Sequence, residues 1–410
     1  MRGISVTIVL TILCLLTNGL HATEPCSHSN WVRECRITSE HRSIKPLESI
    51  SANLTKDENV SISIEIPFLS LTKNISFNDL QSVTINGDHN SAVIINCTHS
   101  TVNSGITFKS VKSITLTRLR LRYCGSLVIM KNRNYSSALT LRYCKTVEIR
   151  YSIIEKSRGI GLTILNHRNG TINIFESNFT RNKIPHEFKK DKIYGGGGVY
   201  VYSGFNWNSS LSISIKFERC HFSRNVAYTR VYRSFYTDEF GEDRSGYGRG
   251  GGVYLAFEKN TITRSCVHVW FLHCMFKRNQ AFLGGGLSVS IGGGRNHRIN
   301  ANITTIVEHS VFDSNGCDKY TARIGGGVHL SYNLHFTSAS MVYKLQNVKF
   351  IRNRAELGGG IFFFSNIWTN PNKHLLIFET CRFEYNRAHT GSAIDMNPTA
   401  LLDMLLDILQ

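Results

Sequence analysis

The sequence predicts an all-β solenoid, a right-handed parallel β-helix. Three observations favour this fold: a short phrase recurs six times in the second half of the 410-residue chain, β-type apolar runs flank each copy, and no helical period lies between them. Each copy reads Phe-x-x-Asn and leads into small residues, which are Gly-Gly-Gly in five copies. The pairs are Phe179/Asn182, Phe222/Asn225, Phe276/Asn279, Phe312/Asn315, Phe350/Asn353 and Phe383/Asn386. The intervals are irregular because extra residues fall mainly in loops, which is typical of stacked repeats.

The residue types of the phrase predict its place in each coil. Stacked parallel strands hold like residues about 4.8 Å apart. We therefore expect the phenylalanines to form an interior aromatic ladder, each ring contributing roughly 1.5–3 kcal/mol by burial. Asparagine suits the tight turn beyond the ring, because it tolerates the left-handed conformation and its amide can bond backbone groups of neighbouring coils. The glycines suit a bend that needs positive φ or close backbone approach.

The first half predicts the same architecture without the phrase. Runs such as Leu139-Thr140-Leu141 and Val147-Glu148-Ile149 recur about one three-strand coil later as Leu162-Thr163-Ile164 and Ile172-Asn173-Ile174. We expect the β-helix over residues 59–396, after a signal peptide over 1–22 and a cap segment over 23–58. The leucine-rich tail over 397–410 predicts a short amphipathic helix that covers the last open coil.

The pairing of Phe-x-x-Asn with Gly-Gly-Gly-Ile/Val/Leu resembles the repeats of chlamydial polymorphic outer membrane proteins and related right-handed β-helix adhesin-like proteins. The resemblance covers about residues 175–395, and the coils before it resemble those of the pectate-lyase-like superfamily. It implies a β-helix exposed on a cell surface or secreted from it. It indicates the fold more narrowly than the function, since β-helices host lyases, hydrolases, tailspikes and adhesins.

The N-terminus predicts secretion. Arg2 precedes an apolar run over 4–16 and small residues suited to cleavage, and the run is shorter than the ~20 residues that span a membrane. In a secreted protein, Asn-x-Ser/Thr sequons predict N-glycosylation. The expected acceptors are Asn53, Asn74, Asn96, Asn134, Asn169, Asn208 and Asn302. The sequon at Asn178 is a poorer candidate, because it precedes the inward Phe179 within a strand.

The cysteines fit an oxidising compartment. Of 11 cysteines, Cys14 lies in the signal peptide and leaves an even number that permits disulfides. Cys26 and Cys35 flank Trp31 in the segment before the β-helix begins, and we expect a cap disulfide between them.

Three further cysteines each stand two residues before a ladder phenylalanine, so they point inward with it. They are Cys220, Cys274 and Cys381. These thiols are either staples between coils or small buried core residues. Cys124 and Cys144, both in Leu-Arg-Tyr-Cys, leave the same alternatives.

The formal net charge of +18 points to an acidic partner. Arg118, Arg120 and Arg122 alternate with leucines, so one strand is expected to turn three guanidinium groups outward, with Arg142 and Arg150 extending the patch on the next coil. Outside a cell the available anions are sulfated or carboxylated glycans and acidic lipid surfaces, and nucleic acid is not an expected partner. The alternative is a solvated face that keeps the solenoid soluble.

The chemistry of β-helix enzymes is not visible in the sequence. Hydrolases of this kind need clustered carboxylates, and lyases typically need acidic calcium ligands with an Arg or Lys base. The chain has neither an Asp-Asp pair nor Gly-His-Gly. We therefore expect no catalytic residue, cofactor or metal.

We expect a secreted recognition or adhesion module whose partner is an extracellular glycan or protein, with no membrane span beyond the signal peptide. The alternatives are a carbohydrate-active enzyme of the pectate-lyase-like class and the N-terminal part of a larger surface receptor. The longest loop insertion, over 235–248, combines aromatic and charged residues. It is either a binding loop or a tolerated insertion.

Overall fold

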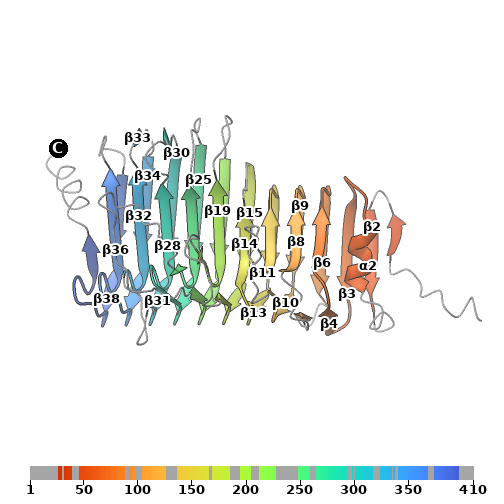
Figure 1. Ribbon diagram of the computed structural model, residues 1–410, viewed down its shortest axis with the longest axis horizontal. Coiled ribbons are helices and arrows are strands. Elements are labelled where there is room, and N and C mark those ends of the chain that lie inside the picture. Colours follow the sequence, from red (N-terminus) through yellow and green to blue (C-terminus); the bar gives the residue numbers. More distant parts are fainter. Residues whose placement is uncertain are drawn as a thin grey trace, which may run out of the picture.

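The chain winds through three parallel sheets, A, B and C, that stack coil upon coil along one axis (Figure 1). The structure, a computed structural model, describes residues 26–29, 32–38, 46–87, 92–97, 104–125, 136–165, 169–184, 194–204, 212–227, 248–258, 265–292, 298–299, 301–316, 324–334, 336–337, 340–367 and 374–396. Each coil contributes one strand to each sheet in the order A, B, C, and every contact between successive coils is parallel. The predicted all-β parallel β-helix is confirmed.

Sheet A has 12 strands and sheets B and C have 10 each. Sheet A consists of β1(Cys26–Ser29), β2(Val32–Ile37), β3(Asn59–Ile64), β6(Ser82–Gly87), β9(Ser113–Thr117), β12(Thr146–Arg150), β15(Asn169–Phe175), β20(Ser212–Glu218), β25(Ser265–Leu272), β30(Ala301–Glu308), β34(Ser340–Gln346) and β37(His374–Glu379). Sheet B consists of β4(Phe68–Leu71), β7(Val93–Cys97), β10(Leu119–Arg122), β13(Ile153–Glu155), β16(Asn178–Thr180), β21(His221–Ser223), β26(Met275–Lys277), β31(Val311–Asp313), β35(Lys349–Ile351) and β38(Arg382–Glu384). Sheet C consists of β5(Ile75–Asn78), β8(Ser104–Lys109), β11(Ser137–Arg142), β14(Ile160–Leu165), β19(Val199–Gly204), β24(Val253–Glu258), β28(Leu287–Gly292), β32(Val328–Leu334), β36(Ile361–Ile367) and β39(Ile394–Met396).

Short strands join the phrase-bearing coils between sheets B and C and between sheets C and A. Three form one small sheet, and two pairs form the others. They are β17(Lys183–Ile184), β22(Val226–Ala227) and β27(Gln280–Ala281); β18(Tyr194–Gly195) and β23(Gly248–Arg249); and β29(Arg298–Ile299) and β33(Phe336–Thr337). These strands keep successive coils in register beside the longer loops.

Strict alternation along the strands builds the core. In β3, Val60, Ile62 and Ile64 are buried while the residues between them are partly exposed. The same alternation in successive coils stacks inward side chains into one continuous apolar core. A second apolar cluster lies on the outer face of sheet C, around Tyr200 and Tyr254.

The phenylalanines of the phrase form one interior stack. Adjacent rings lie nearly parallel with centroids 4.4 to 5.3 Å apart. The first five rings are fully buried, and the ring of the last coil is partly buried. The ladder therefore carries burial and ring stacking together. In order along the axis the rings are Phe179, Phe222, Phe276, Phe312, Phe350 and Phe383.

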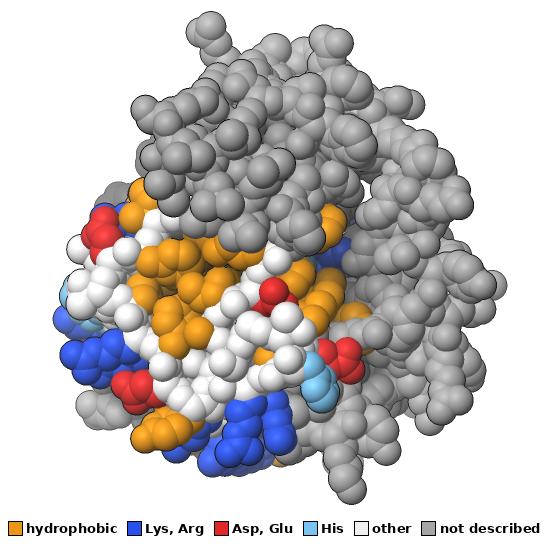
Figure 2. Space-filling view, turned by 90° about the vertical axis from the view of Figure 1, so that its left-hand side faces the viewer, with side chains coloured by type: hydrophobic (Ala, Val, Ile, Leu, Met, Phe, Trp, Pro, Cys, Tyr) orange, Lys and Arg blue, Asp and Glu red, His pale blue; other side chains and the backbone are white. Residues whose placement is uncertain are grey.

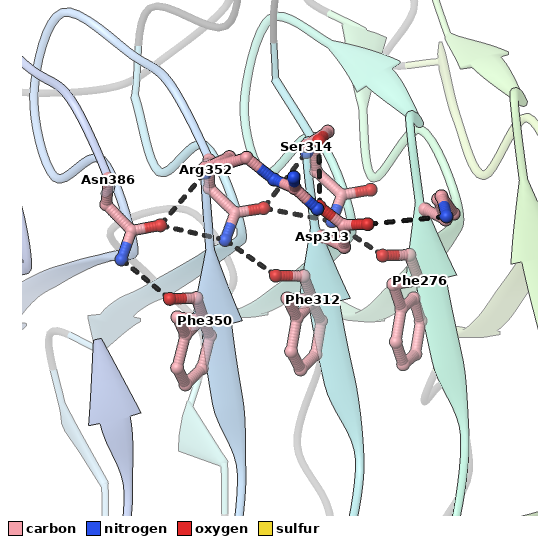
Figure 3. A network of polar contacts seen from close by, with 10 residues as sticks. Phe276, Phe312, Asp313, Ser314, Phe350, Arg352 and Asn386 are labelled. Atoms are coloured by element: carbon pink, nitrogen blue, oxygen red, sulfur yellow. Dashed lines mark hydrogen bonds and ion pairs between the residues drawn. The ribbon is translucent and has the colours of Figure 1, made fainter. Parts of the chain in front are cut away.

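The asparagines form a second, polar ladder that runs alongside the rings (Figure 3). The Nδ2 of Asn315 donates to the carbonyl of Phe276 at 2.8 Å and to the Oδ1 of Asn353 at 3.0 Å. The Nδ2 of Asn225 repeats this pattern, since it donates to the carbonyl of Phe179 at 2.8 Å and to the Oδ1 of Asn279 at 3.1 Å. Each buried amide is thus bonded to the backbone of the coil before it and to the amide of the coil after it.

The last asparagine, Asn386, departs from the other five. It is partly buried, whereas the others are fully buried, because it lies on the last coil that the structure describes. Its Nδ2 still donates to the carbonyl of Phe350 at 2.8 Å, and its Oδ1 accepts from the Nδ2 of Asn353 at 3.0 Å. The terminal repeat therefore keeps the bonds of the ladder towards the preceding coils and loses part of its burial.

The expectation that asparagine suits the turn through its own left-handed conformation is wrong in all six copies. The left-handed residue is the one before each asparagine, for example Arg224 with φ 55° and Tyr385 with φ 55°. The asparagine is placed for its amide hydrogen bonds and not for positive φ. This correction applies to Asn182, Asn225, Asn279, Asn315, Asn353 and Asn386.

The glycine triplets close the coil against the ladder. The first glycine of a triplet has positive φ, as in Gly325 with φ 65°. A Cβ on the third glycine would meet the ring of the next coil, since a Cβ on Gly327 would lie 3.0 Å from Phe350. Phenylalanine and glycine recur together because each ring packs on a glycine from the coil before it.

The two ends of the solenoid differ. At the N-terminal end β2 pairs in parallel with β3, so the stack begins before residue 59. The helix α2(Pro46–Ala52) lies beside this end (Figure 1), and its buried Glu48 accepts hydrogen bonds from Thr72 and the backbone of Lys73. At the C-terminal end the last strands are β37, β38 and β39, and Figure 2 shows apolar side chains gathered there. The predicted signal peptide and the tail over 397–410 lie outside the described residues.

Candidate anion-binding site

Of the five arginines predicted as a patch, four lie on three different sheets and one lies in a turn. Arg118 precedes β10, in a turn with φ 54°, and its guanidinium lies 5.6 Å from the centroid of the Tyr151 ring. Arg120 and Arg122 point outward from β10 in sheet B. Arg142 ends a strand of sheet C and Arg150 ends a strand of sheet A. The expected row of three guanidinium groups on one strand is wrong, because Arg118 lies in the turn before that strand. On the next coil Arg150 does lie beside Arg118, whose backbone amide donates to the Arg150 carbonyl at 3.1 Å, whereas Arg142 lies on another sheet.

The two arginines of β10 are already paired with a carboxylate. The Nε atoms of Arg120 and Arg122 lie 2.8 and 2.7 Å from the Oε1 of Glu155 on the next coil. The Glu155 side chain is only 8% exposed, so the three groups form one partly buried ion cluster. Arg150 is likewise paired with Glu148.

A row of arginines that form no ion pair with another described residue lies instead at the turn that follows sheet B. Arg181, Arg224 and Arg278 occupy equivalent left-handed positions, with φ of 56°, 55° and 54°, and all three are exposed. Their backbone amides donate to the carbonyls of Ser223, Lys277 and Asp313 in the following coils. Neighbouring coils stack about 4.8 Å apart, so the three side chains form a row parallel to the solenoid axis.

None of these three arginines forms an ion pair with a residue that the structure describes. Beside them, on the outer face of sheet B, the hydroxyls of Thr180 and Ser223 lie 2.6 Å apart and share a hydrogen bond. We call Arg181, Arg224 and Arg278 with these two hydroxyls the basic window. Guanidinium forks next to hydroxyl donors are suited to sulfate and carboxylate groups.

Beyond the basic window the next carboxylate is Asp313. Its side chain is 10% exposed, and its Oδ1 lies 2.9 Å from Arg352 and accepts a hydrogen bond from Ser314 (Figure 3). Lys277 approaches its Oδ2 at 3.5 Å. Burial raises the pKa of Asp313, but the hydrogen bonds of Ser314 and Arg352 and the nearby cations outweigh burial and hold the pKa below its ordinary value. The carboxylate therefore stays charged at neutral pH.

A buried serine–histidine pair on the outer face of sheet C was missed by sequence reasoning. The Oγ of Ser288 and the Nδ1 of His329 lie 3.1 Å apart, and Arg249 donates to Ser290 nearby at 2.8 Å. Burial, and to a lesser extent the charge of Arg249, lowers the pKa of His329 to about 3. The imidazole is thus neutral at neutral pH and a poor base. Only the parallel register of β28 and β32 brings the pair together, and no local motif signals it.

Among the described cysteines, some form disulfides and others are free thiols. Cys97 and Cys124 form a disulfide between adjacent coils, while Cys144 is free and its burial raises its pKa to about 11. Cys220 and Cys274 are free, buried and inward, as the phrase register required. Cys381 is free and partly buried.

The predicted cap disulfide stays a prediction. Cys35 is disulfide-bonded, and the antiparallel register of β1 and β2 places Cys26 directly opposite it. Such a link would tie β1 to the first strand of the parallel stack.

Four of the predicted glycosylation acceptors are exposed, and one is not. Exposed are Asn53, Asn74, Asn169 and Asn302. Asn96 is partly buried on β7, opposite Arg122. Asn134 and Asn208 lie outside the described residues, as does most of the predicted binding loop over 235–248.

Within the described ranges no group of three or more His, Cys, Asp or Glu side chains is arranged to hold a metal ion. No helix among the same residues has the length and apolar character of a membrane span. No known protein family matches the chain, and neither a curated protein nor a solved structure matches it. The structure supports a parallel β-helix; membership of the superfamily suggested by the phrase stays a prediction.

Proposed function

We propose that this protein is a secreted recognition module that binds acidic polysaccharides through the basic window. The observation that carries the proposal is the row of three exposed arginines on successive coils, none paired with a described carboxylate. The signal-peptide pattern and the charge of +18 support an extracellular, acidic partner.

The backbone gives no reason for arginine at these positions. A left-handed residue costs roughly 1–2 kcal/mol when it is not glycine, and asparagine or aspartate is the usual exception. The three arginines have φ of 54° to 56° and still carry long cationic side chains. Stacked about 4.8 Å apart they repel one another, so a bound polyanion would relieve that repulsion. The same left-handed turn carries tyrosine or lysine in other coils, as at Tyr123 and Tyr385, so the turn itself does not require three successive arginines.

The basic window is a better site than the arginines of β10. A ligand at Arg120 and Arg122 would have to compete with Glu155, which already lies within 2.8 Å of both Nε atoms. Reversing those arginines would also leave a buried carboxylate without partners, so the loss of binding would be confused with a loss of folding. The arginines of the basic window can be changed without breaking an ion pair of the described structure.

The test is elution from a heparin column with the triple variant Arg181→Glu, Arg224→Glu and Arg278→Glu. We expect the wild-type protein to elute at clearly higher salt than this variant, because the row of cations is replaced by a row of anions. Soluble heparin should also raise the melting temperature of the wild-type protein and not that of the variant.

The matched control changes the same amount of charge elsewhere. Arg36, Lys109 and Lys145 are exposed on other edges of the coils, and their reversal to glutamate lowers the net charge equally. If the control variant elutes as early as the window variant, binding follows net charge alone and the assignment to the basic window fails. Steady release of unsaturated products from uronate polymers would favour a lyase over the proposed binding module.

A further inference from the structure

The basic window ends at a carboxylate on each side, and we infer that Glu155 and Asp313 set the length of acidic polymer that the site accepts. This inference rests on the proposed function. One outward column of sheet B carries both carboxylates. Its successive members, paired strand to strand, are Glu155, Thr180, Ser223, Lys277 and Asp313.

At the first boundary Glu155 pairs with two cations of strand β10, which lie beside the row of turn positions and not in it. Arg120 and Arg122 lie on the coil before it and pair with its Oε1 at 2.8 and 2.7 Å. The next cation on the edge, Lys156, donates to the Tyr123 hydroxyl at 3.2 Å and lies over that ring. An anion extending past Arg181 in this direction therefore meets a carboxylate and occupied cations.

At the second boundary, on the other side of the basic window, Asp313 likewise pairs with two cations. It holds Arg352 at 2.9 Å and Lys277 at 3.5 Å, and the turn position between Arg278 and Arg352 is the uncharged Ser314 (Figure 3). The row of turn cations is interrupted at this coil, and its next member, Arg352, shares the single charge of Asp313 with Lys277. Between the two carboxylates, the three arginines are the turn cations that share no carboxylate of the described structure.

The number of coils between the two carboxylates determines the length of the site along the solenoid axis. Arg181 and Arg278 are two coils apart, about 10 Å, while the two carboxylates are four coils apart, about 19 Å. A linear sulfated chain that lies along the solenoid axis gains contacts until it covers the three arginines. Each further anionic group then falls beside a carboxylate. The site thus selects short acidic stretches and gains little from longer ones.

The experiment compares size-defined heparin oligosaccharides on the wild-type protein and on Asp313→Asn. For the wild type we expect affinity to rise with chain length and then to level off once the basic window is covered. The Asp313→Asn variant releases Lys277 and Arg352, so the plateau should move to longer chains. Affinity for the longest oligosaccharide should rise about threefold to tenfold, as two exposed cations allow.

Two control variants separate the effect of the Asp313 carboxylate from the effect of added charge. Glu148→Gln on the outer face of sheet A adds the same charge, also at an ion-paired carboxylate, and should leave the plateau in place. In the wild type Arg352→Ala should not change affinity, whereas in the Asp313→Asn background it should cancel the gain.

A second variant keeps the inference testable if Asp313→Asn fails to fold. Ser223→Asp places a carboxylate in the middle of the same column and should lower affinity at least about tenfold for every chain length. An unchanged plateau in folded Asp313→Asn would overturn the boundary and leave the proposed function standing. Normal binding by Ser223→Asp would overturn both the boundary and the assignment to the basic window, because Ser223 belongs to that window. A wild-type protein that binds none of the oligosaccharides would overturn both.

Discussion

The two halves of the solenoid stack their coils by different means. In the first half the core is mainly aliphatic, with one stacked pair of rings at Phe77 and Phe108, and a disulfide links two coils at Cys97 and Cys124. In the second half the aromatic and asparagine ladders run through every coil. The stacked columns of inward side chains continue from the first half into the second. Ile154 stacks on Phe179, and the backbone amide of Ser157 donates to the Oδ1 of Asn182.

The difference between the two halves is related to the length of the loops between stacked coils. Neighbouring ladder asparagines of the second half are separated by 33 to 54 residues along the chain. Longer loops cost more entropy to close, although slowly with length. A repeated set of ring stacks and amide hydrogen bonds fixes the register at every coil whatever the loop between them. Register partners of sheet A before the phrase are 23 to 33 residues apart, so the phrase occurs in the coils that are as long as these or longer.

The strongest test of this comparison is removal of an interior ring. Phe312→Ala should lower the free energy of unfolding by about 3–5 kcal/mol, because the ring is fully buried and stacked on both neighbours at 4.4 and 4.9 Å. Phe383→Ala should cost less, since that ring is partly buried and stacks on one described neighbour. Urea unfolding of both variants gives the comparison, and equal losses would contradict a ladder that gains stability from its neighbours.

The asparagine ladder is tested by Asn315→Ala. The substitution leaves the carbonyl of Phe276 and the amide of Asn279 without their partners, and we expect a loss of about 1–3 kcal/mol. The control is Asn173→Ala on the outer face of sheet A, which should stay within about 0.5 kcal/mol. A matching small loss at Asn315 would mean that water replaces the ladder bonds at little cost.

The smallest effect, measured between about pH 7 and about pH 5.5, concerns the covered outer face of sheet C in the second half. The pKa of His329 is about 3 in the folded protein, well below the ordinary value of 6.5, so the folded state binds fewer protons than the unfolded state. The stabilisation is complete above pH 6.5 and is lost as the pH falls from about 6.5 towards 3.

We expect the unfolding free energy to decrease by up to about 1.4 kcal/mol per pH unit in this range, and His329→Gln to flatten the decrease. Denaturant unfolding at about pH 7 and about pH 5.5 measures it. The same substitution at the exposed His221 controls for loss of a histidine. An unchanged slope in His329→Gln would assign the acid sensitivity to other groups.

Sequence alone determined the fold class and the inward residues. Period-two runs specify which side chains face the core, and the six phrases identify the coils that stack. The inward Phe312 and the positive φ of Gly325 both follow from such local rules. The left-handed conformation of the residue before each asparagine did not follow from these rules, because turn chemistry favours asparagine itself at a left-handed position.

Only the tertiary structure decided which arginines form no ion pair with another residue that the structure describes. Arg120 and Arg122 look available along the strand, but the coil register brings Glu155 against them. Arg181 and Arg224 are far apart in the sequence and adjacent across coils, because the intervening residues leave the stack and return to it. Charge pairing in a solenoid depends on which residues lie one coil away. That spacing is set by loop lengths and by the ladders that absorb them, and not by the local sequence.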